Sequence, residues 1–311
     1  MRIVYFGTPD YSRDILHELY KAFKTRSEPN PIKAVVTQKP KPSGRKKYLE
    51  YSPVDDWAHN HKVPIYFDIK KLIGERIEAD LGILASFGEI LPDEALTYFE
   101  HGILNIHPSL LPKYRGPSPV QATLVANDDK AGATIIRLDE KMDHGPIVTQ
   151  FEEDINDNDT TESLRNRLFY RSTEVLIDAI LPYTEGKIKL RNQDHDNAVY
   201  TKLVKKQDGY IPFELLKDAL HGNESKEKML IPFIEDYSIK ASPDSLERFI
   251  RAMQPWPVAF TIVRGADKRL EDKRLQILSA RVEEGKLVPE EVQLEGKNPA
   301  SWSQFTEAYN I

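Results

Sequence analysis

Short apolar runs alternate with segments of helical spacing through the first half of this 311-residue chain. The runs lie at 3–6, 34–37, 81–86 and 102–107. Each has the length of a buried strand, and residues 11–23, after the first run, carry apolar side chains at helical intervals. Strands separated by helices are typical of βαβ units. We therefore expect a doubly wound, Rossmann-like α/β domain with a mostly parallel sheet.

The pattern changes in the second half of the chain. Strand candidates at 133–138 and 147–151 flank a short turn and predict a hairpin, and a long helix is expected from about 160 to 181. The polar stretch that follows has no clear period. We therefore expect a larger domain over 1–188, a linker over 189–205, and a smaller, mostly β domain over 206–311.

Composition excludes several classes of protein. The chain has no cysteine, which rules out disulfides, thiol nucleophiles and thiolate metal sites, and no His, Asp and Glu grouping has convincing metal spacing. Gly7 is the only glycine of the first strand–helix turn, so the three-glycine dinucleotide fingerprint is missing. No run approaches the ~20 apolar residues of a membrane span, and the start lacks the features of a signal peptide. We expect a cytoplasmic protein that uses no metal and contacts no membrane.

Three polar residues are candidates for chemistry. Asn105 and His107 lie two apart at the end of the last predicted strand, so both side chains point to one face, at the edge where α/β sheets bind ligands. An amide and an imidazole together can polarise a carbonyl and exchange a proton near pH 7. Asp143 lies in the predicted hairpin turn and is either a turn former or a carboxylate aimed at His107. The alternative for the pair is a strand end whose polar groups merely satisfy the next turn.

A basic stretch follows the second predicted strand. It comprises Lys39, Lys41, Arg45, Lys46 and Lys47, interrupted by Pro40, Pro42 and Gly44, with no acidic residue. Proline and glycine predict a loop rather than a charged helix. The net charge of the chain is -6, so a broad basic surface is not expected. The stretch is either a solvated loop or a local arm that contacts phosphates.

Several motifs occur in one order along the chain. They are Phe6–Asp10, Ser52–Val54, Ser86–Pro92, Asn105–Gly116, Asp143–Gly145 and Pro255–Pro257. With these motifs the sequence resembles the methionyl-tRNA formyltransferases, a family of folate-dependent formyltransferases. The resemblance is almost continuous over the first half of the chain and patchy over the second.

The resemblance implies transfer of a formyl group from 10-formyltetrahydrofolate to the amino group of methionyl initiator tRNA, in translation initiation. Asn105 and protonated His107 would stabilise the formyl oxygen, and Asp143 would pair with His107 and help to remove the amine proton. The residues implied at the folate are Phe87, Gly88, Ile90, Ser109, Leu110, Leu111 and Pro112. The basic residues Lys39, Lys41, Arg45, Lys46 and Lys47 would contact the tRNA. The family also implies an OB-like barrel at 206–311 that contacts tRNA, and we expect a monomer.

Some features depart from the family pattern. Lys41 stands where an arginine is expected between the two prolines, which keeps the charge but loses the planar fork that binds phosphate. The segment 211–241 contains an insertion, the last domain is abbreviated, and its residues are not predominantly basic. A nucleotide-sugar N-formyltransferase, which uses the same donor, is therefore the alternative function. A folate- or RNA-binding module without catalysis is a further alternative, against which the intact Asn105, His107 and Asp143 argue.

Overall fold

The structure, a computed structural model, describes residues 1–43, 48–263, 269–270 and 272–309. Its contacts divide the chain into two compact units. The first unit comprises residues 1–112, 132–152 and 166–197, and the second comprises 113–131, 153–165 and 198–311. The last boundary, at 197/198, falls within the linker predicted over 189–205, and the second unit also includes two segments that lie between parts of the first unit. The predicted domain limits remain a prediction.

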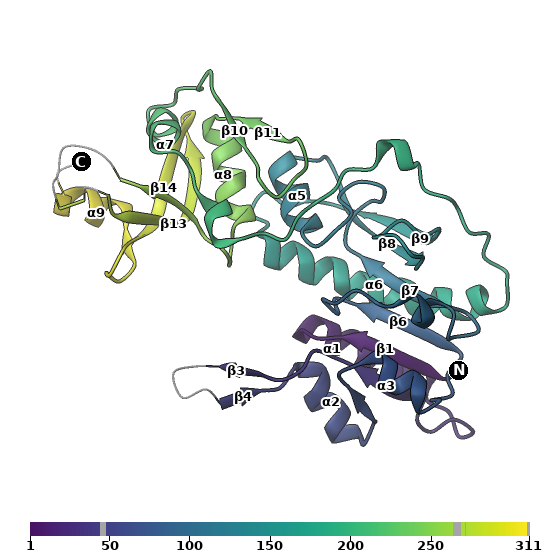
Figure 1. Ribbon diagram of the computed structural model, residues 1–311. Coiled ribbons are helices and arrows are strands. Elements are labelled where there is room, and N and C mark those ends of the chain that lie inside the picture. Colours follow the sequence, from purple (N-terminus) through teal and green to yellow (C-terminus); the bar gives the residue numbers. More distant parts are fainter. Residues whose placement is uncertain (44–47, 264–268, 271, 310–311) are drawn as a thin grey trace. The chain divides into compact units, whose positions relative to one another are not determined.

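A seven-stranded sheet forms the centre of the first unit (Figure 1). Its strands are β1 (Ile3–Gly7), β2 (Ile32–Val36), β5 (Ile65–Tyr66), β6 (Leu81–Ala85), β7 (Ile103–His107), β8 (Ala131–Arg137) and β9 (Ile147–Glu153). The order is β5-β2-β1-β6-β7-β8-β9. The pairs from β5 to β7 are parallel, and β8 runs antiparallel to β7. The predicted doubly wound α/β fold is thereby confirmed.

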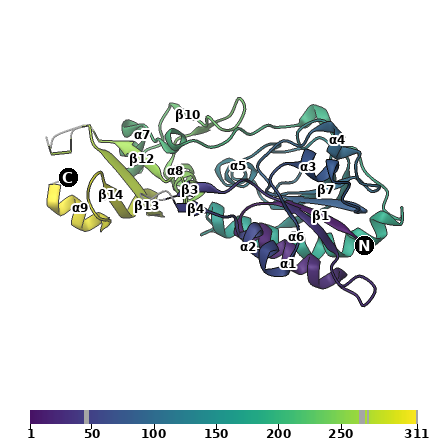
Figure 2. The same cartoon turned by 60° about the horizontal axis from the view of Figure 1, so that its bottom comes forward.

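Helices cover both faces of this sheet, as Figure 2 shows. They are α1 (Asp10–Phe23), α2 (Pro53–His61), α3 (Ile69–Gly74), α4 (Asp93–Leu96) and most of α6 (Thr161–Thr184). Alternation along β1 explains the two layers: Ile3 and Tyr5 pack with α1, α2 and α6, whereas Val4 and Phe6 pack with α3 and α4. No helix in the described part of the chain is long and apolar enough to cross a membrane.

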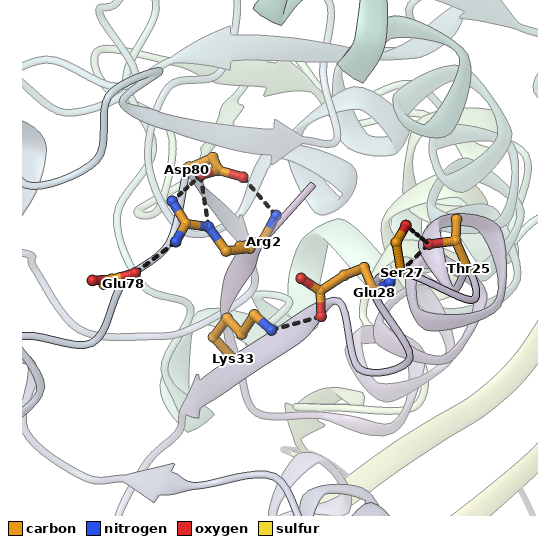
Figure 3. Close-up of polar contacts among 7 residues, drawn as sticks. All are labelled: Arg2, Thr25, Ser27, Glu28, Lys33, Glu78 and Asp80. Carbon is orange, nitrogen blue, oxygen red and sulfur yellow. Dashed lines mark hydrogen bonds and ion pairs between the residues drawn. The ribbon is translucent and has the colours of Figure 1, made fainter.

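Ionic contacts fix the starts of the first strands (Figure 3). The guanidinium and backbone amide of Arg2 donate to the Asp80 carboxylate over 2.6–2.9 Å, and Arg2 Nη1 donates to Glu78 Oε2 at 2.8 Å. Burial acts to raise the pKa of Asp80, but the hydrogen bonds from Arg2 outweigh it and lower that pKa below its ordinary value. Near the start of β2, Lys33 donates to Glu28 at 2.6 Å. The Arg2–Asp80 contacts join the start of β1 to the start of β6.

The second unit contains a four-stranded antiparallel sheet in the order β12-β13-β14-β15. Its strands are β12 (Ala259–Ile262), β13 (Arg274–Glu283), β14 (Lys286–Leu294) and β15 (Ala300–Ser301), beside a small pair, β10 (Lys228–Leu230) and β11 (Ser238–Lys240). Its helices are α5 (Pro119–Ala126), α7 (Phe213–Leu220), α8 (Pro243–Ala252) and α9 (Trp302–Tyr309). The predicted C-terminal sheet is confirmed, in an open strand order that suits an abbreviated barrel. The helical share is larger than expected, because the short helices α7 and α9 were not predicted.

Candidate active site

Strand β7 carries the first two candidate residues. Asn105 pairs with Leu84 of β6 and Ile136 of β8, and His107 pairs with Thr134 of β8. Because side chains alternate along a strand, Asn105 and His107 share one face. Both are buried, with 6% and 4% of their surface exposed. The structure thus places the pair at the carboxyl end of a central strand.

Asp143 reaches the same place from the connection between β8 and β9. Its Oδ1 lies 3.4 Å from Asn105 Nδ2, which donates to it, and its Oδ2 lies 3.5 Å from His107 Nδ1. The side chain of Asp143 is only 14% exposed. Three residues separated by up to 38 positions therefore meet in one buried polar cluster. A neutral amide, an imidazole and a carboxylate in contact can hold and move a proton and donate to a developing negative charge.

The turn that carries Asp143 is tightly built. Asp143 itself has φ +47°, in the left-handed region that non-glycine residues seldom adopt. A Cβ on Gly145 would lie 1.9 Å from the carbonyl oxygen of Arg137, so only glycine allows the turn to approach the end of β8 this closely. His144 Nδ1 lies 2.6 Å from Asp139 Oδ2, and its ring stacks on His195 at 3.8 Å. These contacts give His144 a structural role in the turn.

The segment after β7 contains the predicted folate residues Ser109, Leu110, Leu111 and Pro112. Its backbone is fixed by Thr134, whose hydroxyl donates to Ser109 O at 2.6 Å and accepts from Leu111 N at 3.1 Å. Gln150 of β9 completes the arrangement by donating to Leu111 O and to the Thr134 hydroxyl. The sequence interpretation missed Thr134 and Gln150. Both are polar residues within predicted strands, the one signal that could have drawn attention to them.

The other predicted folate residues, Phe87, Gly88 and Ile90, follow β6. Phe87 is buried against Phe6, with ring centroids 5.9 Å apart, while Ile90 is 89% exposed. Gly88 has φ +82°, so this chain reversal favours glycine. Phe87 O accepts hydrogen bonds from Thr8 and Gln38, which tie the segment to β1 and to the end of β2.

A cavity of about 630 Å³ opens beside this segment. Phe87 and Ile90 line it together with Lys39 and Lys41 of the basic stretch. Lys41 Nζ also donates to Gln38 Oε1 at 3.0 Å. Two groups of residues that were predicted for different ligands thus line one cavity of the first unit.

The basic stretch differs in part from the predicted loop. Its flanks pair as two short antiparallel strands, β3 (Lys41–Ser43) and β4 (Tyr48–Glu50), with Lys41 opposite Glu50. The proline at position 42 is compatible with a two-stranded ribbon because such a strand has an open edge. Arg45, Lys46 and Lys47 lie outside the described residues.

Comparisons with known proteins identify the family of this chain. The Formyl transferase family model matches residues 1–180. The methionyl-tRNA formyltransferase of Chloroflexus aggregans is 36% identical over 91% of this chain and 81% of its own length. That of Halalkalibacterium halodurans is 32% identical over 87% of this chain and 77% of its own.

Solved structures share the fold at lower identity. An N-formyltransferase from Helicobacter canadensis, in complex with folinic acid and dTDP-3-aminofucose, has a TM-score of 0.62 at 16% identity, covering 91% of this chain and 88% of that one. The methionyl-tRNA formyltransferase of Clostridium thermocellum has a TM-score of 0.53 at 16% identity, covering 94% and 98%. At such identity the solved structures establish the fold alone, whereas the family model and the sequence relatives establish membership. The chain belongs to the methionyl-tRNA formyltransferase family.

Proposed function

We propose that this protein transfers the formyl group of 10-formyltetrahydrofolate to the α-amino group of methionyl initiator tRNA. The observation that carries the proposal is the buried contact of Asp143 with both Asn105 and His107, within a domain of the formyltransferase family. Identities of 32–36% to methionyl-tRNA formyltransferases over most of the chain support the tRNA as acceptor.

The reaction assigns a task to each of the three residues. The amine nitrogen attacks the formyl carbon, a new C–N bond forms, and the bond from that carbon to the folate nitrogen breaks. Negative charge develops on the formyl oxygen, to which Asn105 and protonated His107 donate; one such donor is typically worth about 3 kcal/mol. An amide nitrogen carries two hydrogens, so Asn105 can serve Asp143 and the formyl oxygen together.

Asp143 has the remaining task of handling protons. Its contacts of 3.4 and 3.5 Å are longer than ordinary hydrogen bonds, and catalytic contacts often tighten only when the substrate is bound. Because the Asp143 carboxylate lies beside His107 Nδ1, the ring of His107 is oriented to donate through Nε2. Asp143 helps to take the proton that the attacking amine loses, and the departing folate nitrogen receives a proton in exchange.

The folate donor would lie against the two segments that follow β6 and β7. Phe87, Gly88 and Ile90 line one side, and Ser109, Leu110, Leu111 and Pro112 the other. The folinic acid held by the Helicobacter canadensis neighbour supports a folate for this fold. The exposed Ile90 side chain is an apolar group available to a flat ring.

The tRNA would be held by the basic stretch of the β3–β4 hairpin, through Lys39, Lys41, Arg45, Lys46 and Lys47. Residues 206–311 form its second contact region, joined by 189–205 to a catalytic domain over 1–188. We further propose that the protein is a cytoplasmic monomer and that formyl transfer needs no metal.

A nucleotide-sugar N-formyltransferase remains the second candidate. It is favoured by residues 206–311, which are not predominantly basic. The TM-scores of 0.62 and 0.53 to the two solved structures both come at 16% identity and bear on the fold alone. The basic stretch and the sequence relatives favour tRNA.

The roles of the three residues are tested by substitution. Asn105→Ala, His107→Ala and Asp143→Ala should each lower kcat for formyl transfer by at least ~100-fold, because each removes a donor or a proton carrier of the transition state. His59→Ala, at an exposed position of α2, is the matched control and should leave kcat unchanged. Circular dichroism and Tm should show folded protein throughout. A His107→Ala enzyme that keeps more than about a tenth of kcat would contradict the proposed mechanism.

A further inference from the structure

A side chain from outside the predicted site holds the turn of Asp143. Gln193, beyond the end of α6, donates from Nε2 to Asp143 O and to Gly145 O, both at 2.8 Å. Gln193 is only 6% exposed although it lies in a polar stretch of the sequence. Both carbonyl oxygens are therefore bonded by one buried amide, which a segment 48–50 residues away contributes.

The turn needs such a contact, because the backbone of Asp143 has an unfavourable conformation. A non-glycine residue in the left-handed region costs about 1–2 kcal/mol, and Asp143 is held there at φ +47°. A change in this φ would swing the carboxylate away from Asn105 and His107, which lie at the end of a rigid strand. A shift of about 1 Å in a reacting group can cost about 100-fold in rate.

We propose that Gln193 is a positioning residue for formyl transfer: its amide fixes the backbone of Asp143 so that the carboxylate meets Asn105 and His107. The proposal rests on the catalytic role proposed for Asp143. Gln193 belongs to the polar segment that the sequence suggested to be a linker, so the segment also serves the active site.

Two substitutions separate this role from simple packing. Gln193→Met keeps the length of the side chain and removes both donors, and Gln193→Glu keeps the shape but offers a carboxylate to two carbonyl oxygens. Each should lower kcat by about 10- to 100-fold, while KM for the folate and for the charged tRNA stays within about twofold. Asn197→Ala is the matched control, because its amide bonds the neighbouring Asp194 within the same polar segment. It should leave kcat and KM unchanged.

A double-mutant cycle identifies the route through Asp143. In an Asp143→Ala background the further change Gln193→Met should have no additional effect on kcat, since there is no carboxylate left to position. Losses that multiply would overturn the proposal, as would a Gln193→Met and a Gln193→Glu enzyme with wild-type kcat. If Gln193→Met lowers Tm, Gln193→Glu decides, because it preserves the packing. Failure of the proposed function has a different outcome: Asp143→Ala itself would then retain wild-type kcat.

Discussion

At the scale of single residues, the position of Asp143 depends on several neighbouring residues that hold its turn. Gly145 lets the turn meet the end of β8, Gln193 bonds two of its carbonyl groups, and the His144 ring is held between Asp139 and His195. The same holds after β7, where the hydroxyl of Thr134 fixes the backbone of Ser109 and Leu111. The geometry of the candidate site therefore depends on backbone segments that several side chains hold in place.

We expect Gly145→Ala to lower both stability and kcat. Its Cβ would lie 1.9 Å from a backbone oxygen, which cannot move aside as a flexible side chain could, so the turn must shift. Overpacking of this kind typically costs about 1–3 kcal/mol, measured as a fall in the free energy of unfolding in urea. The same displacement of Asp143 should reduce kcat about 10-fold or more.

The control for this change is Gly74→Ala at the end of α3. Nothing lies within 4 Å of the added Cβ, and Gly74 is not among the residues with positive φ. Alanine at such a position should be neutral or stabilise by up to about 1 kcal/mol. If Gly145→Ala behaved like Gly74→Ala in both assays, the close approach described for the turn would be refuted.

At the scale of elements, the β3–β4 hairpin carries the basic stretch that we propose to contact the tRNA. We expect Arg45→Ala with Lys46→Ala to raise KM for charged tRNA and to flatten its dependence on salt, because each neutralised phosphate releases condensed counterions. The slope of log KM against log salt concentration should fall by about one for each phosphate that is no longer neutralised. KM for the folate should change by less than about twofold, since Lys41, which shares a cavity with Phe87, is left in place.

Steady-state kinetics at several salt concentrations makes this measurement. Lys21→Ala with Lys24→Ala is the control, since it removes two exposed charges at the C-terminal end of α1 and should affect neither KM. An unchanged tRNA KM and salt slope in the Arg45 and Lys46 variant would reduce the basic stretch to a solvated loop and favour a sugar acceptor.

The elements of the first unit follow from local patterns more closely than those of the second. Uninterrupted apolar runs predicted β1, β6 and β7 to within one or two residues, and the helical spacing of Ile15, Leu16 and Leu19 predicted α1. The β3–β4 hairpin was missed because its pairing is held by backbone groups, and Lys41, Pro42 and Tyr48 have no alternating apolar pattern. Helix α7 was missed as well, although its buried residues Leu215, Leu216 and Ala219 have helical spacing, because only eight residues carry that pattern.

Only the part of the candidate site that lies on one strand could be predicted from local sequence. Two positions of separation on β7 were enough to place Asn105 and His107 on one face. For Asp143 the residues left two alternatives, a turn former or a partner of His107, and the family resemblance favoured the second. The contacts of Gln193 followed from neither, since a single glutamine in a polar stretch carries no period and no motif.

At the scale of the whole molecule, the compact units do not follow the order of the sequence. Residues 113–131 and 153–165 belong to the second unit although they lie between segments of the first. A break in the hydrophobic period along the chain can reveal a linker. It cannot show that a segment packs with a distant unit, because long-range contacts decide which segments pack together. The family membership, in contrast, is a property of the whole chain, since the relatives match 87–91% of it.

The most direct test of the account is formyl transfer by the intact protein with 10-formyltetrahydrofolate and two alternative acceptors. One acceptor is methionyl initiator tRNA and the other is a nucleotide-linked aminosugar, with the His107→Ala protein as a blank for each. We expect formylated methionyl-tRNA with a kcat/KM at least ~1,000-fold above that for the sugar, because only the tRNA would engage the basic stretch and residues 206–311. A higher kcat/KM for the aminosugar, with no formylation of the tRNA, would contradict it.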